Sequence, residues 1–455
     1  MNEAGVSQIL ANQRAFFNTH QTKDVFYRIA ILKLLKKTIL DYQEKIEEAL
    51  WKDLHKSKEE TFLTEIGLVL HEIDFHIKNV SHWAKPKKVS TPFFMLPSGS
   101  KTKADPLGIA LIIAPWNYPF QLLINPLVGA ISAGCCAVLK PSPDAPHLAK
   151  VMEDMVSSIF EPNYIGLVQG GKEENELLLK QKFDIIFFTG SSAVGKVIMR
   201  AAAENLTPVV LELGGKSPVL VNKDADIPKA AKRIIWGKTI NAGQTCIAPD
   251  YLFVHSEVKN KLLEEMDKSL EDMFGSDRKK SGYYGRIIHE RAFDRLIKLM
   301  AKGKARIGGE TEKADLYIAP TVLEGLGLED DIMQEEIFGP ILPLFEFSDF
   351  EQVINFVNSK EKPLAIYYFG NAESVEELMH KTSSGGVCIN DTLMHVSNQH
   401  LPFGGVGNSG MGSYHGANSF WAFSHKKSIV TTPTWIDLPF KYMPFKHFKW
   451  VKKMI

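Results

Sequence analysis

The feature that most constrains the fold of this chain is a series of short apolar runs, rich in valine and isoleucine, that alternate with helix-like segments. The runs lie at residues 109–114, 137–139, 166–169, 185–188, 209–211 and 219–221. Runs of this length favour parallel strands that are buried on both faces by the intervening helices. A second alternating region follows Cys246 and continues to about residue 389. The sequence therefore predicts an α/β fold.

Two N-terminal segments depart from this alternation. Residues 7–83 carry apolar side chains at three- and four-residue spacing, which predicts packed helices. Residues 85–102 contain Pro86, Pro92 and Pro97, which break the helical rhythm and predict an extended arm. Because 455 residues exceed what one compact core holds, we expect two or three domains, with a boundary at the turn 213–216.

The charge balance narrows the class of partner. Basic and acidic residues number 53 each, so no general attraction to nucleic acid is expected, and the partner is predicted to be a small molecule. The N-terminus lacks the pattern of a signal peptide, and no apolar run reaches the ~18 residues of a membrane span. The four cysteines form no pattern typical of a metal or redox site. We therefore expect a cytoplasmic protein with no metal site.

The segment 183–203 reads as a strand, a glycine turn and a helix. Gly190, Ser191 and Gly195 lie in this turn, whose backbone N–H groups would face an anion such as a nucleotide phosphate. The spacing nearly matches the phosphate loop of nucleoside triphosphatases, but Val197 stands where that loop holds magnesium through serine or threonine. The dinucleotide pattern Gly-x-Gly-x-x-Gly is also incomplete, so a purely structural turn is an equal alternative.

Cys246 ends a turn of small and polar residues, NAGQT at 241–245. Free cysteines are usually buried as small apolar residues, and the contexts of Cys135, Cys136 and Cys388 favour this interpretation. The surroundings of Cys246 instead favour a thiolate that faces a cleft and is stabilised by backbone dipoles, as a nucleophile requires.

Glu212 ends an apolar strand, between Leu211 and Leu213. Partial burial there would raise the pKa of its carboxyl toward the range that suits a general base. A strand end that faces solvent is the alternative, and this segment taken alone favours it.

Seven motifs taken together resemble the aldehyde dehydrogenase superfamily, in that family's own order along nearly the whole chain. They are PWNYP (115–119), LKPS (139–142), FTGS (188–191), LELGGK (211–216), GQTC (243–246), EEIFGP (335–340) and PFGG (402–405). The short N-terminal region and the string 241–250 are most similar to the class 3 branch. Substrates of that branch tend to be medium- to long-chain aliphatic and aromatic aldehydes.

The resemblance implies a Rossmann-like cofactor domain, an α/β catalytic domain and a small β arm that bridges subunits. On this basis we assign residues 1–84 and 103–212 to the dinucleotide-binding domain and residues 213–388 to the catalytic domain. Residues 85–102 and 389–430 would form the bridging and oligomerisation arm, and residues 431–455 a basic, aromatic C-terminal tail. A homodimer is the expected assembly.

The resemblance also implies a reaction in two stages. Attack of Cys246 on an aldehyde would give a thiohemiacetal, whose oxyanion would be held by the Asn117 side-chain amide and the Cys246 backbone N–H. Hydride transfer to NAD or NADP would leave a thioester. Glu212, as general base, would activate the water that hydrolyses this thioester to the carboxylic acid.

The same resemblance assigns seven residues to the cofactor. Glu336 would bind the nicotinamide ribose, with Phe338 packed beside that end. The others are Lys140 at the adenosine ribose, Ser191 with Gly190 and Gly195 near the pyrophosphate, and Trp116.

One departure from the family pattern concerns the choice of cofactor. Many members have a glutamate three residues after the lysine, where it grips the adenosine ribose and repels the extra phosphate of NADP. Pro143 stands at that position and Asp144 follows it. We therefore predict measurable use of NADP.

Two other functions are open to a chain of this kind. One is a CoA-acylating relative, in which a thiol takes the acyl group instead of water, and the presence of Glu212 argues against it. The other is a catalytically silent protein on the same fold, which the joint presence of Cys246, Asn117 and Glu212 argues against.

The tail from Pro439 to Lys453 mixes aromatic residues with lysines and contains no acidic residue. Such a segment could make a weak peripheral contact with an anionic membrane surface. Packing of its aromatic residues against the body of the protein or against a sister subunit is at least equally favoured.

Overall fold

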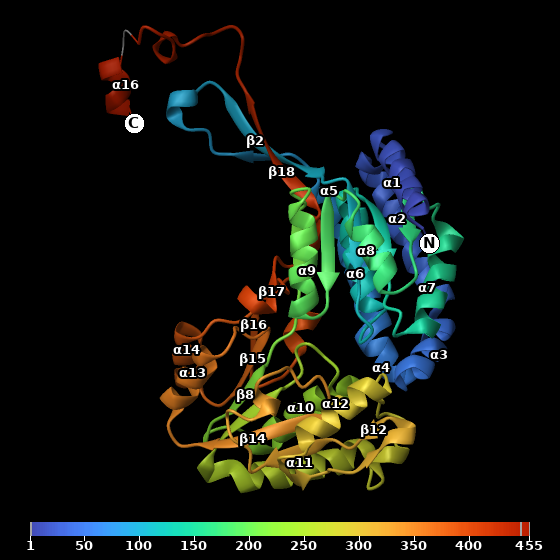
Figure 1. Cartoon of the computed structure of the whole chain (residues 1–455). Coiled ribbons are helices and arrows are strands. Elements are labelled where there is room, and N and C mark those ends of the chain that lie inside the picture. Colours follow the sequence, from blue (N-terminus) through green and yellow to red (C-terminus); the bar gives the residue numbers. More distant parts are fainter. Residues whose placement is uncertain (1, 446–447, 455) are drawn as a thin grey trace.

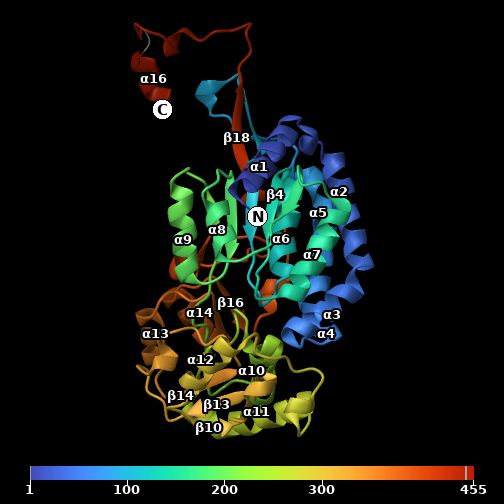
Figure 2. The ribbon, with the colours of Figure 1, turned by 45° about the vertical axis from the view of Figure 1, so that its right-hand side comes forward.

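The computed structural model describes residues 2–445 and 448–454. Two α/β units lie one above the other, and a narrow β arm projects from the upper one (Figure 1). The C-terminal segment continues beyond this arm in both views (Figures 1 and 2). Within the described ranges, no helix is both long enough and apolar enough to cross a membrane.

The upper, first unit is built on a six-stranded sheet with the order β17-β7-β6-β3-β4-β5. Strands β3 to β7 are parallel, whereas the short β17 runs antiparallel to β7. The bounds are β3 Ile109–Ile113, β4 Cys136–Lys140, β5 Ile165–Leu167, β6 Ile185–Thr189, β7 Val209–Glu212 and β17 Gly410–Met411. Five of the six apolar runs form β3 to β7, as predicted.

Helices cover both sides of this sheet, with α9 on one side and α2 and α7 on the other (Figures 1 and 2). The prediction of N-terminal helices is confirmed, because Leu32, Leu35 and Ile39 of α2 form one fully buried face. The helices are α1 Glu3–Asn18, α2 Val25–Asp41, α3 Gln43–Leu54, α4 Lys58–Thr61, α5 Gly67–Trp83, α6 Gln121–Ala133, α7 Pro146–Ile159, α8 Lys172–Leu179 and α9 Ser192–Ala203.

The second unit contains a seven-stranded sheet with the order β10-β13-β14-β9-β8-β15-β16, in which only β10 is antiparallel to its neighbour. The strands are β8 Pro218–Val221, β9 Tyr251–His255, β10 Lys304–Ile307, β13 Thr321–Glu324, β14 Ile341–Phe347, β15 Ala365–Phe369 and β16 Gly386–Ile389. The apolar run 219–221 belongs to this sheet as β8, because the chain crosses between the units after Glu212.

The helices of the second unit are α10 Ile227–Thr239, α11 Lys259–Phe274, α12 Glu290–Met300, α13 Phe350–Ser359 and α14 Ala372–Lys381. A small two-stranded sheet joins β11 Thr311–Glu312 to β12 Tyr317–Ile318. The larger buried apolar cluster runs through the first unit and continues into the second, where it includes Val219, Leu252 and Leu262, and a smaller cluster lies within the second unit.

The arm is a three-stranded antiparallel sheet of β1 Lys87–Val89, β2 Gly99–Pro106 and β18 Ser424–Thr431. The arm predicted at 389–430 is too wide, since only β18 joins this sheet. Before it, β17 pairs with β7, and α15 Ala417–Ala422 packs on α6. Glycine permits the close turn that precedes β17, because a Cβ on Gly405 would lie 2.0 Å from the Ser409 carbonyl oxygen. Beyond the arm lies α16 Phe448–Met454.

Candidate active site

Glu212 is the last residue of β7, at the point where the chain leaves the first unit. Its backbone is held on both sides, because the Gly190 N–H donates to its carbonyl oxygen at 3.0 Å and Gly410 of β17 pairs opposite it. Its side chain is 2 % exposed, and neither carboxyl oxygen has a hydrogen-bond partner among the described residues. Burial raises the pKa of Glu212 well above its ordinary value. The solvent-facing alternative is therefore wrong.

Cys246 follows a tight turn after α10. Asn241 and Ala242 adopt left-handed backbone angles in this turn, with φ of 51° and 50°. Such angles cost energy in residues other than glycine, and they persist where the surrounding structure enforces them. The turn leaves Cys246 half-buried, with its side chain lining two separate cavities.

The ionisation of Cys246 differs from the sequence prediction. Burial raises the pKa of its thiol above the ordinary range, and the carboxyls of Glu336 and Glu212 raise it further. Its own backbone N–H and that of Ile247 act in the opposite direction, as expected, but burial outweighs these dipoles. The resting group is therefore a thiol, and a proton must leave it before it can attack a carbonyl carbon.

The first cavity, here called the polar cavity, has a volume of about 360 Å³ and lies where the two units meet. Eight of the ten predicted site residues line it. Its lining consists of Pro115, Trp116, Asn117, Thr189, Gly190, Ser191, Glu212, Gly214, Cys246, Arg295, Glu335, Glu336 and Phe338. Residues from distant parts of the sequence thus converge on one space.

Several buried oxygen atoms in the polar cavity have no hydrogen-bond partner among the described residues. They are Asn117 Oδ1, Thr189 Oγ1, Glu336 Oε1 and both carboxyl oxygens of Glu212. Buried polar atoms are normally paired, so this group indicates a space built for a polar ligand. Gly190 and Ser191 lie there at the N-terminus of α9, where backbone N–H groups favour an anion. A dinucleotide, with ribose hydroxyls and phosphates, fits this set of groups.

The loop that carries Glu336 is fixed by charged residues that the sequence alone did not reveal. Arg295 donates to the backbone oxygen of Glu336 at 3.2 Å, and Asp250 Oδ2 accepts the Ile337 N–H at 2.9 Å. A Cβ on Gly214 would lie 2.0 Å from Glu336 Oε2, so any larger residue there would displace this carboxyl. Burial, followed by the charge of Asp250, raises the pKa of Glu336 to about 8.

Two predicted site residues, Lys140 and Gly195, do not line the polar cavity. Lys140 ends β4 and is 1 % exposed, and its Nζ donates to the backbone oxygens of Gly170 at 2.6 Å and Pro141 at 2.9 Å. Burial lowers the pKa of Lys140 to about 8. Gly195 instead allows α9 to approach the end of β7, because a Cβ there would lie 2.7 Å from Leu213 Cδ2.

The second cavity, here called the apolar cavity, has a volume of about 250 Å³ and also ends at Cys246. It is lined by Leu63, Thr64, Leu68, Tyr118, Gln121, Leu122, Trp236, Thr245, Cys246, Ile247, Leu393, Met394, Val396, Ser397, Phe403 and Tyr414. Its exposed side carries large apolar residues, with Leu63 69 % and Met394 48 % exposed. No motif of the sequence predicts this cavity, because its lining comes from segments that no single motif contains.

Asn117 lies in the loop after β3 and is 2 % exposed. Its Nδ2 donates to the Gln244 carbonyl oxygen at 3.0 Å, which places the amide against the turn that carries Cys246. The neighbouring Tyr118 makes a second link to this turn, through a 2.6 Å hydrogen bond between its hydroxyl and that of Thr245. The predicted nucleophile and the predicted oxyanion donor are therefore brought together.

Comparison with known proteins agrees with this geometry. The model of the "Aldehyde dehydrogenase family" matches residues 1–429. The chain is 45% identical to a 4,4'-diaponeurosporen-aldehyde dehydrogenase of Staphylococcus aureus, over 98% of both chains. It is 44% identical, over 94% of both chains, to a Mus musculus "Aldehyde dehydrogenase, dimeric NADP-preferring". A solved structure, "Substrate bound state of Staphylococcus Aureus AldH", matches with a TM-score of 0.97 at 44% identity, over 98% of this chain and 99% of that one. The chain belongs to the aldehyde dehydrogenase family and is an enzyme that acts on aldehydes.

Proposed function

We propose that this enzyme oxidises hydrophobic aldehydes to carboxylic acids through a covalent thioester on Cys246, with NAD or NADP as the hydride acceptor. The observation that carries the proposal is the position of Cys246 between an apolar and a polar cavity. An aldehyde chain in the apolar cavity would bring its carbonyl carbon to the thiol. A cofactor in the polar cavity would approach the same carbon from the other side.

Each catalytic role is supported by a contact or by burial. The Cys246 thiol would first lose its proton to solvent, and its sulfur would then form a bond to the carbonyl carbon. Asn117 Nδ2 and the Cys246 backbone N–H would donate to the oxyanion that forms. The bound cofactor supplies the acceptor for the hydride that leaves this intermediate. Glu212 then takes a proton from the water that attacks the thioester, and its unpartnered carboxyl oxygens are free to do so.

The polar cavity also supports the cofactor roles proposed for its residues. Glu336 Oε1 is an unpartnered acceptor suited to a ribose hydroxyl, and Gly190 and Ser191 would face the pyrophosphate. Trp116 and Phe338 meet edge to face, with ring centroids 5.4 Å apart, and form one wall. Lys140 stays assigned to the adenosine ribose, and Gly195 is the residue that lets α9 pack closely against the end of β7.

We expect aldehyde preference to follow chain length. Burying one methylene group is worth about 0.8 kcal/mol, so kcat/KM should rise about three- to fourfold for each added carbon until the apolar cavity is filled. NAD(P)H formation across a series of straight-chain aldehydes measures this. A flat or falling series would contradict the proposed substrate class. The same assay with and without coenzyme A tests the acylating alternative, for which only the CoA-containing reaction should turn over.

NADP is expected to support turnover. Pro143 is exposed just beyond β4, so no carboxylate at that position opposes a 2'-phosphate, and one relative is named NADP-preferring. The ratio of kcat/KM for the two cofactors measures the preference. Pro143→Glu should lower kcat/KM for NADP more than for NAD, whereas the uncharged control Pro143→Gln should change the two alike. A wild-type ratio that heavily favours NAD would refute the prediction.

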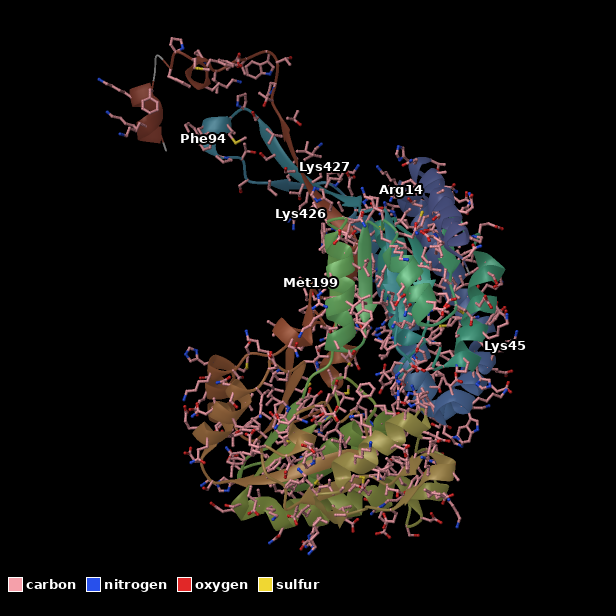
Figure 3. All side chains as sticks on the ribbon, viewed as in Figure 1. Arg14, Lys45, Phe94, Met199, Lys426 and Lys427 are labelled. Atoms are coloured by element: carbon pink, nitrogen blue, oxygen red, sulfur yellow. The ribbon has the colours of Figure 1, made fainter. Side chains whose placement is uncertain are left out.

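A homodimer is supported by exposed apolar surface. Helix α9 buries Gly195, Ile198 and Ala202 but exposes Val197 and Met199 by 50 % and 46 %. Met199 points outward from α9 below the arm, and Phe94 lies at the tip of the arm (Figure 3). We infer that the outer face of α9, which carries these exposed apolar side chains, lies in the interface, and one relative is named dimeric.

Val197→Glu combined with Met199→Glu should therefore convert the dimer to a monomer of 51.0 kDa in light scattering, because two charges would be buried in the interface. The matched control is Leu40→Glu, on an exposed site of α2. A double variant that keeps the mass of the dimer would exclude this face as the interface.

A contact of the tail with an anionic membrane surface and a cytoplasmic location both stay predictions of the sequence. All four cysteines are free thiols, which supports a reducing compartment.

A further inference from the structure

Lys56 and Glu65 form a buried ion pair that none of the motifs contains. Lys56 Nζ lies 2.6 Å from Glu65 Oε1, and the two side chains are 1 % and 0 % exposed. Lys56 follows α3, and Glu65 lies in the π-helical turn Phe62–Ile66 after α4. Both views place α4 where the first unit meets the second (Figures 1 and 2). Removing two charges from water costs much of the free energy that their attraction provides. The stability of the fold alone therefore does not explain such a pair.

Glu65 uses its second oxygen to hold the start of α6. Glu65 Oε2 accepts the backbone N–H groups of Phe120 and Gln121, each at 3.0 Å. Phe120 is the N-cap of α6 and Gln121 its first residue, and a helix leaves the N–H groups at its start without partners of its own. The carboxylate therefore fixes the point at which the loop carrying Asn117 becomes a helix.

Lys56 holds the middle of the same loop. Lys56 Nζ donates to the Asn117 backbone oxygen at 3.2 Å and lies 4.3 Å from the centre of the Tyr118 ring. The Asn117 oxygen also accepts from Asn241 Nδ2 at 2.8 Å. The Asn117 backbone oxygen thus accepts hydrogen bonds from two donors, Lys56 Nζ and Asn241 Nδ2.

Asn241 links these hydrogen bonds to the turn that carries Cys246. Its Nδ2 also donates to the Gln244 carbonyl oxygen at 3.2 Å, the same oxygen that accepts from Asn117 Nδ2. The backbone N–H of Asn241 donates in turn to Glu60 Oε1 at 2.7 Å. One short segment, 56–65, therefore fixes both the oxyanion loop and the nucleophile turn.

We propose that Lys56 and Glu65, acting with Asn241, are positioning residues that hold the Asn117 amide where the oxyanion forms. The inference rests on the oxyanion role proposed for Asn117. Small errors in the placement of such a donor weaken it in the transition state more than in the bound substrate. Loss of the pair should therefore lower kcat and leave KM nearly unchanged.

The test is a double-mutant cycle on the full-length enzyme. Lys56→Met combined with Glu65→Gln removes both charges but keeps an oxygen for the Phe120 and Gln121 N–H groups. We expect kcat to fall about 10- to 100-fold and KM to change less than about threefold. The alkylation rate of Cys246 by iodoacetamide should stay as in the wild type, because the thiol itself is not held by the pair. In an Asn117→Ala background the same pair of changes should cost less than about threefold in kcat, because the donor it positions is gone.

Two further variants complete the design. Asn241→Gly keeps the left-handed backbone and removes the side-chain donors, so it tests the predicted fall in kcat if the pair variant does not fold. Lys36→Met with Asp74→Asn removes a 2.7 Å ion pair between α2 and α5 and should leave kcat unchanged.

The outcomes distinguish the positioning role of the ion pair from the oxyanion role of Asn117. If kcat falls equally in the wild-type and Asn117→Ala backgrounds, or stays at the wild-type level in a folded variant, the positioning role is overturned. If Asn117→Ala alone leaves kcat unchanged, the oxyanion role proposed for Asn117 fails first.

Discussion

Replacing Cys246 with alanine is expected to lower kcat for aldehyde oxidation by at least about 10⁴-fold, because no other group can form the acyl intermediate. Cys246 is the only cysteine lining either cavity among the residues that the structure describes there. The variant should still fold, since the side chain is half-buried and alanine removes a single sulfur atom. NAD(P)H formation with a medium-chain aldehyde is the measurement.

The matched control is Cys388→Ala. Cys388 is 8 % exposed and contacts His395 Nδ1 at 3.0 Å, but it lines neither cavity. Its loss should leave kcat near that of the wild type. Wild-type turnover by the Cys246→Ala variant would show that the thioester mechanism is wrong.

Local patterns were sufficient to predict the strands of the first sheet, whereas the roles of the site residues came from the resemblance to a family. A strand followed by a glycine turn identifies a strand end, and the ends of β6 and β7 carry Gly190 and Glu212 to the same cavity. The cysteine turn could be placed in the same way. The strand predictions succeeded because each depends on a few neighbouring residues.

The remaining features depend on contacts between distant segments. The thiol form of Cys246 results from burial by both units and from the charge of Glu336, which lies 90 residues away in sequence. The Lys56–Glu65 pair joins the N-terminal helices to a loop that follows β3. No period or motif marks such contacts, and the sequence also could not show that run 219–221 joins the second sheet.

The pH dependence of kcat should follow Glu212. Burial raises the pKa of its carboxyl, so the group keeps its proton to a higher pH than an exposed glutamate does. Only the ionised form can accept a proton from water, so kcat should rise with pH through this raised pKa. The rise should therefore lie above the ordinary range of a carboxylic acid, and it should disappear in Glu212→Gln. A Glu212→Gln variant with the wild-type profile would assign the rise to another group.

Glu212→Gln should also separate the two stages of the reaction. Glutamine is similar in size but cannot accept a proton, so thioester hydrolysis should slow about 10²- to 10⁴-fold, while hydride transfer still occurs once per site. Mixing the variant with aldehyde and cofactor should give a burst of about one NAD(P)H per subunit, followed by slow turnover. Mass spectrometry should find the acyl group on the peptide that contains Cys246. If neither burst nor acyl adduct forms, Glu212 is required at the first stage. There it would accept the proton of the Cys246 thiol, whose pKa is raised by burial.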